Sequence, residues 1–433
     1  MHRHMWTFGV VLLCPVIVVA VSGFSRGPAH RSRDRDRGFG AVIPTGVDLV
    51  ILRHAIEMPR EGQQTFRFAT FGGEAFWGDT LHLHLAVAGD LFSGVGPGVS
   101  PNTAFAVGLK VDLEALPPEL VAQLQQGEID LDDPAATLAW LQMHAVVGVT
   151  GFFHPDSALK SLGIQCALCH STVDDAPAPG IGRRLDGWAA RDLNIGAIVA
   201  LAPHLQPVAE PLGGSVDALR AVLHAWGPGT FDAAVLLDGQ ALRPDGTPGA
   251  TLIPPAFGLA GVNLHTWTGS GSVTHWNALV ANLAMHGKGT FFDPRLDDAG
   301  QFPLAASAGL GHVRHDPDLI TPRLAGLPLY QLASPAPEPP PGSFDPEAAV
   351  RGARLFTDKA PCAACHVPPL STEPGWNLHT PAEIGIDAFQ ANRAPDRRYR
   401  TAPLKGLRAH LQGGFYHDGR LATLQKALPS FAH

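Results

Sequence analysis

The chain has 433 residues, more than the roughly 250 to 300 over which one hydrophobic core usually grows, so two or three domains are expected. Its formal net charge of -8 gives no basic field for a polyanion, which argues against nucleic acid as a partner. The composition is 45% hydrophobic with 48 Gly and 39 Pro, which predicts a real core, short helices and long irregular connections.

The N-terminus has the three-part pattern of a secretory signal. Basic residues at 2–4 precede an apolar run at about 8–21, which ends in small residues near Ser22. The run is shorter than the roughly 18 to 20 residues that cross a bilayer. We predict a signal peptide at 1–23, no stable membrane span after its cleavage, and a disordered linker at 24–40. The protein is then periplasmic or otherwise exported.

Two helices are expected from a repeated spacing of glycine and an aromatic residue. Gly62 precedes Phe66 by four positions, and Gly352 precedes Phe356 by the same interval. On a helix this spacing puts both residues on one face, where the glycine lets another backbone approach while the ring packs beside it. Each segment is a candidate first helix of its own domain.

A long insertion follows the first of these helices. Within it, 116–119 and 130–134 carry the N-cap and first-turn proline signals of helix starts. Asp130, Asp132 and Asp133 are also candidate calcium ligands, although capping is the commoner role of such aspartates. We assign 41–331 to an N-terminal domain that contains this insertion.

The chemistry of the chain centres on two copies of one motif, Cys166-Ala-Leu-Cys169-His170 and Cys362-Ala-Ala-Cys365-His366. Two cysteines followed directly by histidine are typical of c-type haem attachment. The thiols add across the haem vinyl groups, and the adjacent histidine reaches the iron. The cofactors expected are therefore two covalently bound haem c groups, with His170 and His366 as proximal ligands.

The cysteine count fits this interpretation better than its alternatives. Four of the five cysteines belong to the motifs and Cys14 lies in the signal, so no disulfide is expected after cleavage. A four-thiolate zinc site usually has roughly 15 to 20 residues between its pairs, far fewer than here. A thioredoxin-like pair would not require the histidine twice.

The second motif lies in a small C-terminal domain. Residues 332–342 are rich in proline and form a stiff linker, and 343–433 follow as a cytochrome c domain. The predicted fold class is mainly α, with two cytochrome c-type haem domains, long loops and the large insertion in the first domain.

The distal ligands decide whether each iron only transfers electrons or also reacts. For the first haem the candidates are Met285, His265, His275 and His286, unless the site is open. No methionine follows Cys365, so a histidine is expected at the second haem. The candidates there are His379, His410, His417 and His433.

Three further motifs end the chain: Thr401-Ala-Pro-Leu404, Phe415-Tyr-His-Asp-Gly-Arg420 and Thr423-Leu424. Together with the two attachment motifs, they resemble the bacterial di-haem cytochrome c peroxidase family, to which the MauG enzymes belong. The large di-haem relatives of that family are the nearest in detail, and the di-haem rubber oxygenases are more distant.

The resemblance implies a division of labour between the haems. The C-terminal haem would accept electrons from a small redox protein, and the N-terminal haem, with His170 as its catalytic proximal ligand, would meet peroxide or oxygen. A tryptophan commonly lies between the two haems in this family. Trp188, Trp267 and Trp276 are the candidates for that place.

Two departures from the family pattern bear on the distal sites. The family's sixth ligand follows the His-Asp-Gly motif by about fourteen residues, where this chain has Pro429 and soon His433. The family's distal histidine after the first motif is also missing from 183–188. Arginines at 183, 184, 397, 398 and 400 are candidate partners of haem propionates, because guanidinium groups bind carboxylates bidentately.

The favoured function is an exported di-haem oxidoreductase that passes electrons through the C-terminal haem to a peroxide- or oxygen-reactive N-terminal haem. One alternative is an electron carrier with no substrate of its own. Another is an oxygenase acting on an organic substrate, for which residues 190–330 would have to build a pocket.

Overall fold

The structure is a computed structural model that describes residues 45–359, 362–410 and 413–427. The chain divides into two compact units, Met1–Leu49 and Val50–His433, and both CxxCH motifs lie in the second. The predicted signal peptide at 1–23, the linker at 24–40 and His433 lie outside the described residues. Among the described residues, no helix combines the length and the apolar character that crossing a membrane requires.

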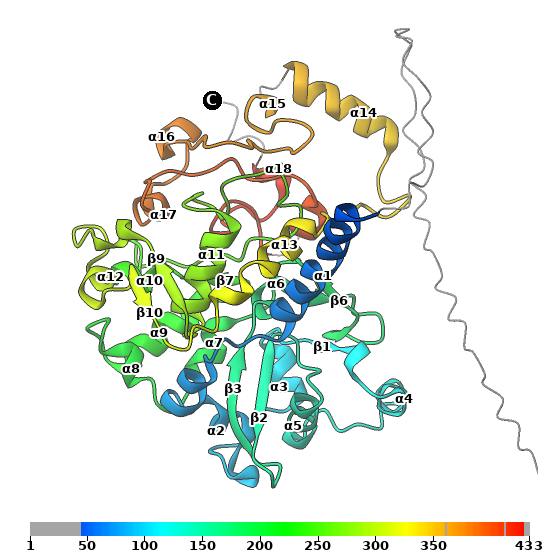
Figure 1. The fold of residues 1–433 in the computed structure, drawn as a ribbon, viewed down its shortest axis with the longest axis vertical. Coiled ribbons are helices and arrows are strands. Elements are labelled where there is room, and N and C mark those ends of the chain that lie inside the picture. Colours follow the sequence, from blue (N-terminus) through cyan, green and yellow to red (C-terminus); the bar gives the residue numbers. More distant parts are fainter. Residues whose placement is uncertain (1–44, 360–361, 411–412, 428–433) are drawn as a thin grey trace, which may run out of the picture. The chain divides into compact units, whose positions relative to one another are not determined.

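Helices are the main regular structure (Figure 1). Those before the first motif are α1 (Val47–Phe68), α2 (Leu83–Ala88), α3 (Pro101–Ala106), α4 (Pro118–Gln126) and α5 (Pro134–Gln142). From the first motif to the proline-rich segment they are α6 (Ala167–His170), α7 (Ile195–Ala200), α8 (Gln206–Ala209), α9 (Val216–Trp226), α10 (Val235–Asp238), α11 (Val273–Leu279), α12 (Pro303–Ala308) and α13 (Gly326–Ala333).

The C-terminal part has shorter helices. They are α14 (Pro346–Arg354), α15 (Cys362–Cys365), α16 (Pro381–Ile384), α17 (Phe389–Asn392) and α18 (Leu424–Ala427). Segments 75–80, 280–284 and 355–359 are π-helical. Short 3-10 turns occupy 90–92, 113–115, 294–297, 321–323 and 407–410.

The strands described pair only in twos. β2 (Val149–Phe153) and β3 (Leu159–Ile164) form an antiparallel hairpin with Val149 opposite Ile164. The other antiparallel pairs are β4 (Ser171–Val173) with β6 (Arg184–Asp186), β7 (Thr230–Phe231) with β8 (Thr251–Leu252), and β9 (Thr290–Phe292) with β10 (His312–Arg314). A parallel pair joins β1 (Val111–Asp112) to β5 (Ile181–Gly182).

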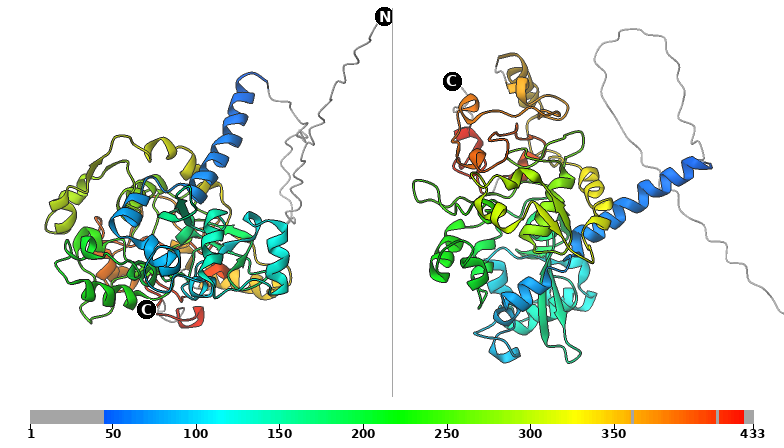
Figure 2. Two further views of the ribbon diagram at one scale, coloured as in Figure 1. Left: turned by 90° about the horizontal axis from the view of Figure 1, so that it is seen from below. Right: turned by 60° about the vertical axis from the view of Figure 1, so that its left-hand side comes forward.

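Helix α1, seen along its length in Figure 2, packs as the glycine spacing predicts. A Cβ at Gly62 would lie 2.1 Å from the carbonyl oxygen of Gly326, so the backbones of α1 and α13 touch here. Phe66 is 1% exposed, and its ring lies 5.6 Å from that of Tyr330 on α13. The Tyr330 hydroxyl donates to Asp186, which also accepts from Arg67. The glycine therefore allows α1 and α13 to cross closely, and the aromatic pair packs beside the crossing.

Helix α14 has the predicted residues but not this packing. A Cβ at Gly352 would meet no atom within 4 Å, and Val350 and Leu355 are more than half exposed. Asp345 caps the helix by accepting from the amides of Glu347 and Ala348. The expectation of a helix at the second spacing is confirmed, and the close backbone approach at Gly352 is not found.

The proline signals in the insertion mark helix starts, as expected. Pro118 begins α4 and Pro134 begins α5, where Asp133 accepts from the amide of Ala135. Asp130 accepts from the amide of Asp132, and the Asp132 carboxylate accepts from Asn102. These aspartates serve local hydrogen bonds, and calcium binding at them stays a prediction.

Candidate functional site

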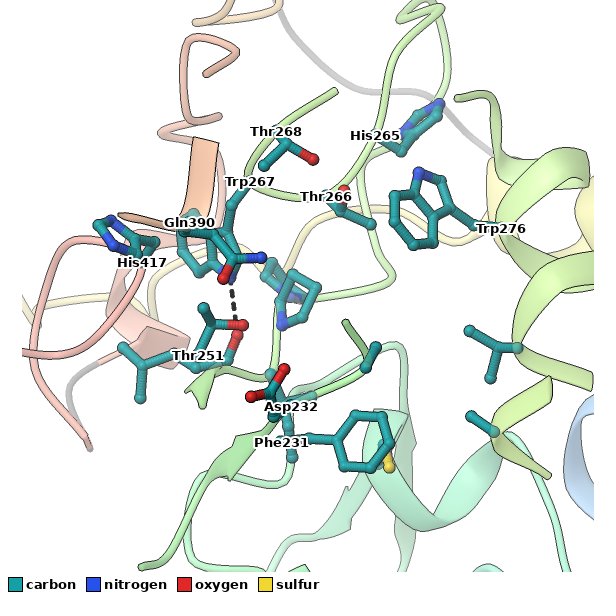
Figure 3. A pocket seen from close by; sticks show the side chains of 18 of the residues that line it. Phe231, Asp232, Thr251, His265, Thr266, Trp267, Thr268, Trp276, Gln390 and His417 are labelled. Carbon is teal, nitrogen blue, oxygen red and sulfur yellow. Dashed lines mark hydrogen bonds between the residues drawn. The ribbon is translucent and has the colours of Figure 1, made fainter. Parts of the chain in front are cut away.

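Both CxxCH motifs line one cavity of about 1750 Å³. Single-ligand pockets usually measure roughly 300 to 1,000 Å³, so this cavity can take more than one large group. Its wall is mostly apolar and draws on segments far apart in the sequence. Figure 3 shows part of it, with His265, Trp267, Trp276 and His417 around the hollow.

The first motif is the more enclosed of the two, because Ala167 and Leu168 are buried, whereas Ala364 in the second motif is exposed. The cysteines and histidines of both motifs are half-buried on the cavity wall. Burial raises the pKa of the Cys166 and Cys169 thiols to about 12, so both are protonated at neutral pH. Burial also lowers the pKa of His170 to about 4, so this imidazole is neutral. His170 Nδ1 lies 3.1 Å from the carbonyl oxygen of Pro254 and donates to it. That bond fixes the tautomer that leaves the Nε2 lone pair free to bind a metal.

The second motif has the same internal pattern in a more open setting. His366 Nδ1 lies 3.3 Å from the carbonyl oxygen of Ser371, and burial lowers the pKa of the ring. Cys362 and Cys365 are half-buried, and the next residue after the motif, Val367, is 37% exposed. Burial also raises the pKa of the Cys365 thiol. The four described cysteines are free thiols.

A three-residue segment joins the first motif to the C-terminal part. The amide of Leu252 donates to the carbonyl of His417 at 2.7 Å, and the Leu252 carbonyl accepts from Trp267 Nε1 at 2.7 Å. Two residues later, the carbonyl of Pro254 accepts from His170. Residues 252–254 therefore contact His170 of the first motif, a cavity tryptophan and the Tyr-His-Asp-Gly segment at once.

The distal candidates for the first haem lie in different surroundings. Met285 is 4% exposed and packs in an apolar cluster with Phe66, Ala281 and Cys166. His265 is 6% exposed, its Nε2 contacts the Val262 carbonyl, and its Nδ1 has no hydrogen-bond partner. The structure brings both to the cavity wall, together with His286, whose ring stacks on Phe76.

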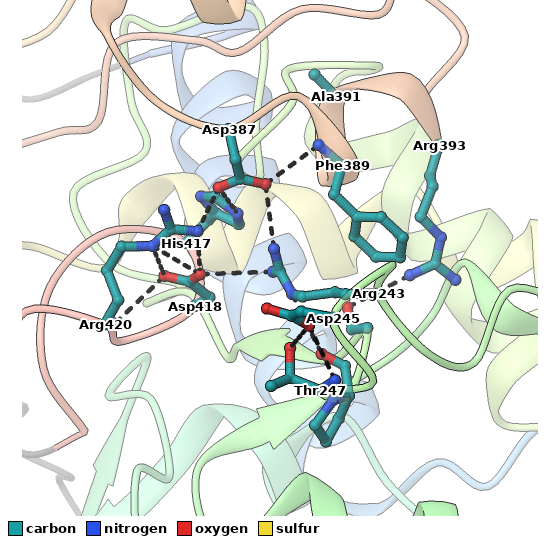
Figure 4. A network of polar contacts seen from close by, with 12 residues as sticks. Arg243, Asp245, Thr247, Asp387, Phe389, Ala391, Arg393, His417, Asp418 and Arg420 are labelled. Carbon is teal, nitrogen blue, oxygen red and sulfur yellow. Dashed lines mark hydrogen bonds and ion pairs between the residues drawn. The ribbon is translucent and has the colours of Figure 1, made fainter.

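His417 lies at the edge of a network of charges (Figure 4). It is 2% exposed, and neither ring nitrogen has a hydrogen-bond partner. Burial lowers the pKa of the ring to about 4. Asp387, His417 and Asp418 have metal-ligand spacing, but Arg243 and Arg420 neutralise both carboxylates. The charges of the two carboxylates are consequently balanced by arginines, without a metal ion.

His410 and His379 complete the histidines expected near the second haem. His410 lines the cavity at 9% exposure with its Nε2 unpartnered. His379 Nε2 instead lies 2.6 Å from Glu373 and its Nδ1 lies 2.9 Å from Glu383. Cys365, Glu373 and His379 also have metal-ligand spacing. His379 is thus held by two carboxylates at hydrogen-bond distance, whereas His417 Nε2 lies 3.6 Å from Asp387. His410 has no carboxylate partner among the described residues.

The five arginines predicted as propionate partners differ in exposure, in ion pairing and in whether they line the cavity. Arg183 is exposed beside Asp174, Arg184 is paired with Asp112, and Arg397 and Arg398 are exposed. Arg400 lines the cavity. Sequence reasoning missed Arg191, which lines the cavity at 5% exposure. Its only signal in the sequence was its place in an apolar stretch soon after the first motif.

Of the three tryptophans expected between the haems, two line the cavity. They are Trp267 and Trp276, and Trp267 is held by its bond to Leu252. Trp188 packs edge-on against Phe257 and beneath Arg408. Trp77 also lines the cavity and donates to the Met285 carbonyl, a contact that no local sequence pattern predicts.

Comparison with known proteins gives one partial similarity. The chain is 34% identical over 88 residues to the methylamine utilization protein MauG of Methylorubrum extorquens, which covers 19% of this chain and 24% of that protein. The chain therefore spans about a quarter of the length of this relative. No family model matches the chain, and no solved structure matches it. The similarity supports a link to MauG over that part of the sequence.

Proposed function

We propose that this chain is an exported di-haem c-type cytochrome oxidoreductase, in which the C-terminal haem accepts electrons and the N-terminal haem reacts with peroxide or oxygen. The observation that carries the proposal is that both CxxCH motifs line one large, mostly apolar cavity. The partial similarity to MauG points to the same kind of oxidoreductase.

The residues present fit two haem c groups. Each motif offers two reduced thiols for the vinyl groups and a neutral histidine whose Nδ1 is held by a backbone carbonyl. A bound haem supplies an iron that exchanges single electrons and, with an open sixth position, binds a small oxygen species. Around it the chain contributes an apolar wall that excludes water and fixes the orientation of the imidazole.

The different exposure of the two motifs supports the division of labour. A redox protein must bring its own cofactor close to the haem that accepts electrons, and the second motif is the more open one. A reactive haem benefits from a closed, dry site, and the first motif is the more enclosed one, with Ala167 and Leu168 buried. His410 and His417 are the proposed sources of the sixth ligand at the second haem.

Spectra of the oxidised and reduced protein test this proposal. We expect two haems per chain, one high-spin and one low-spin, with peroxide or cyanide perturbing only the high-spin haem. Two low-spin haems that neither reagent perturbs would replace the proposal with the electron-carrier alternative. A purified exported protein without covalent haem, shown by staining after denaturing electrophoresis, would refute both.

Substitution of the two histidines identifies the sixth ligand of the relay haem. We test His410→Ala and His417→Ala separately. The variant that removes the sixth ligand should convert the low-spin haem to high-spin. The other variant leaves the low-spin spectrum unchanged. His379→Ala is the matched control, because Glu373 and Glu383 already engage both nitrogens of that ring. Unchanged low-spin spectra in both variants would exclude His410 and His417 as that ligand.

A further inference from the structure

Two guanidinium groups in the cavity wall have no carboxylate partner among the described residues. Arg191 is 5% exposed, and its Nε and Nη1 have no hydrogen-bond partner. Arg400 donates to the carbonyls of Leu264 and Thr401 and to the Thr372 hydroxyl, all of them neutral groups. Burial lowers the pKa of each arginine to about 10.

Other buried arginines in the molecule are treated differently. Arg184 is paired with Asp112, and Arg393 is paired with both Asp232 and Asp238. A buried cation without a counter-charge is costly, because desolvation is not repaid by a nearby anion. Arg191 and Arg400 therefore each have room for an anion that the described residues do not supply.

Each of these arginines belongs to one motif. The amide of Ala190, next to Arg191, donates to the carbonyl of Cys169 at 2.9 Å. Arg400 contacts Thr372, which directly follows the residue whose carbonyl accepts from His366. Among the described residues, the cavity wall thus has an arginine without a carboxylate partner beside each CxxCH: buried Arg191 at the first and half-buried Arg400 at the second.

We propose that Arg191 and Arg400 each bind a carboxylate, and that these carboxylates are propionates of the first and second haem, respectively. The inference rests on the proposed function, because it needs the two haems. A guanidinium group presents donors in a planar fork that matches a carboxylate, and inside an apolar cavity such a pair is strong.

Redox titration of the purified two-haem protein followed by absorbance tests the inference. A buried positive charge favours the reduced iron, which carries one positive charge fewer. Arg191→Gln is expected to lower the midpoint potential of the first haem only, and Arg400→Gln that of the second only. Arg183→Gln is the matched control, because Arg183 is exposed and lies beside Asp174, and it should leave both potentials unchanged.

Arg191→Lys keeps the charge and covers the case in which Arg191→Gln does not fold. We expect Arg191→Lys to lower the midpoint potential of the first haem by less than half the shift seen in Arg191→Gln. If Arg191→Gln does not fold, Arg191→Lys should still leave the second haem at its wild-type potential. If the wild type binds two haems but both glutamine variants titrate like Arg183→Gln, this inference fails while the proposed function stands. If the wild type binds no haem, the proposed function itself fails. A free anion instead of a propionate would make the potentials of the wild type depend on exchange into anion-poor buffer, which also contradicts the inference.

Discussion

The two copies of the glycine–aromatic helix differ in what surrounds them. In the first, Gly62 lies against Gly326 and Phe66 is buried beside Tyr330. In the second, the space around Gly352 is open and the helix is exposed along its length. The same contrast holds for the motifs, because the first is the more enclosed of the two. Equal local sequence patterns therefore belong to unequal environments, and packing from distant segments makes the difference.

Removing the cysteine pair of one CxxCH motif or the other should give the largest difference in stability between the two motifs. Cys166→Ala with Cys169→Ala, and Cys362→Ala with Cys365→Ala, are each expected to halve the haem content, from two to one. The first pair should also lower the thermal midpoint more, because it empties an enclosed part of the cavity. Pyridine haemochrome absorbance and thermal unfolding measure both effects. Equal falls in thermal midpoint would remove the distinction drawn between the motifs.

The aromatic residues of the two helices provide a second contrast. Phe66→Ala should cost about 3 to 5 kcal/mol of unfolding free energy, because it empties a fully buried site at the α1–α13 crossing. Phe356→Ala should cost about 1 kcal/mol or less, because that ring is half-exposed. Urea unfolding of the two variants gives the comparison. A cost at Phe356 as large as that at Phe66 would show that the second helix is packed in the haem-bound protein.

The glycines should respond with opposite signs. Gly62→Ala places a methyl group against the Gly326 carbonyl and should cost about 1 to 3 kcal/mol. Gly352→Ala meets no atom and should stabilise the protein by about 0.5 to 1 kcal/mol, since alanine is the better helix former. Both changes are read from the same urea curves. Destabilisation by Gly352→Ala would mean that a backbone approaches this helix as one approaches α1.

The smallest expected effect is a pH dependence of thermal stability that arises near the second CxxCH motif. Burial alone lowers the pKa of His379, but its hydrogen bonds to Glu373 and Glu383 outweigh burial, and the pKa is raised. Protonated His379 therefore stabilises the fold below about pH 6.5, and this contribution is lost as the pH rises through the folded pKa. The thermal midpoint of His379→Gln should fall below that of the wild type at pH 5.5 and approach it at pH 9. A constant difference across this range would contradict the assignment.

Local sequence signals predict the helix starts well, and the packing of single residues only in part. Pro118 and Pro134 begin helices, and Gly62 with Phe66 form a packing face, because such effects depend on neighbours within one turn. The partner of that face, Gly326, lies far along the chain, and no local pattern names it. Arg191 escaped prediction for a related reason. Whether an arginine is paired depends on carboxylates brought near it by the fold, so an unpaired one is visible only in three dimensions.

The three-residue segment 252–254 contacts both His170 of the first motif and the C-terminal loop that contains His417. The Leu252 amide is bonded to the carbonyl of His417, and the Pro254 carbonyl holds the ring of His170. A shift of the C-terminal loop that moved Leu252 would also act on the carbonyl that holds the ring of His170. The His417 contact is made by its backbone carbonyl, so it survives substitution of the side chain. Coupling between the two sites is therefore expected to follow the backbone of the loop rather than the His417 ring.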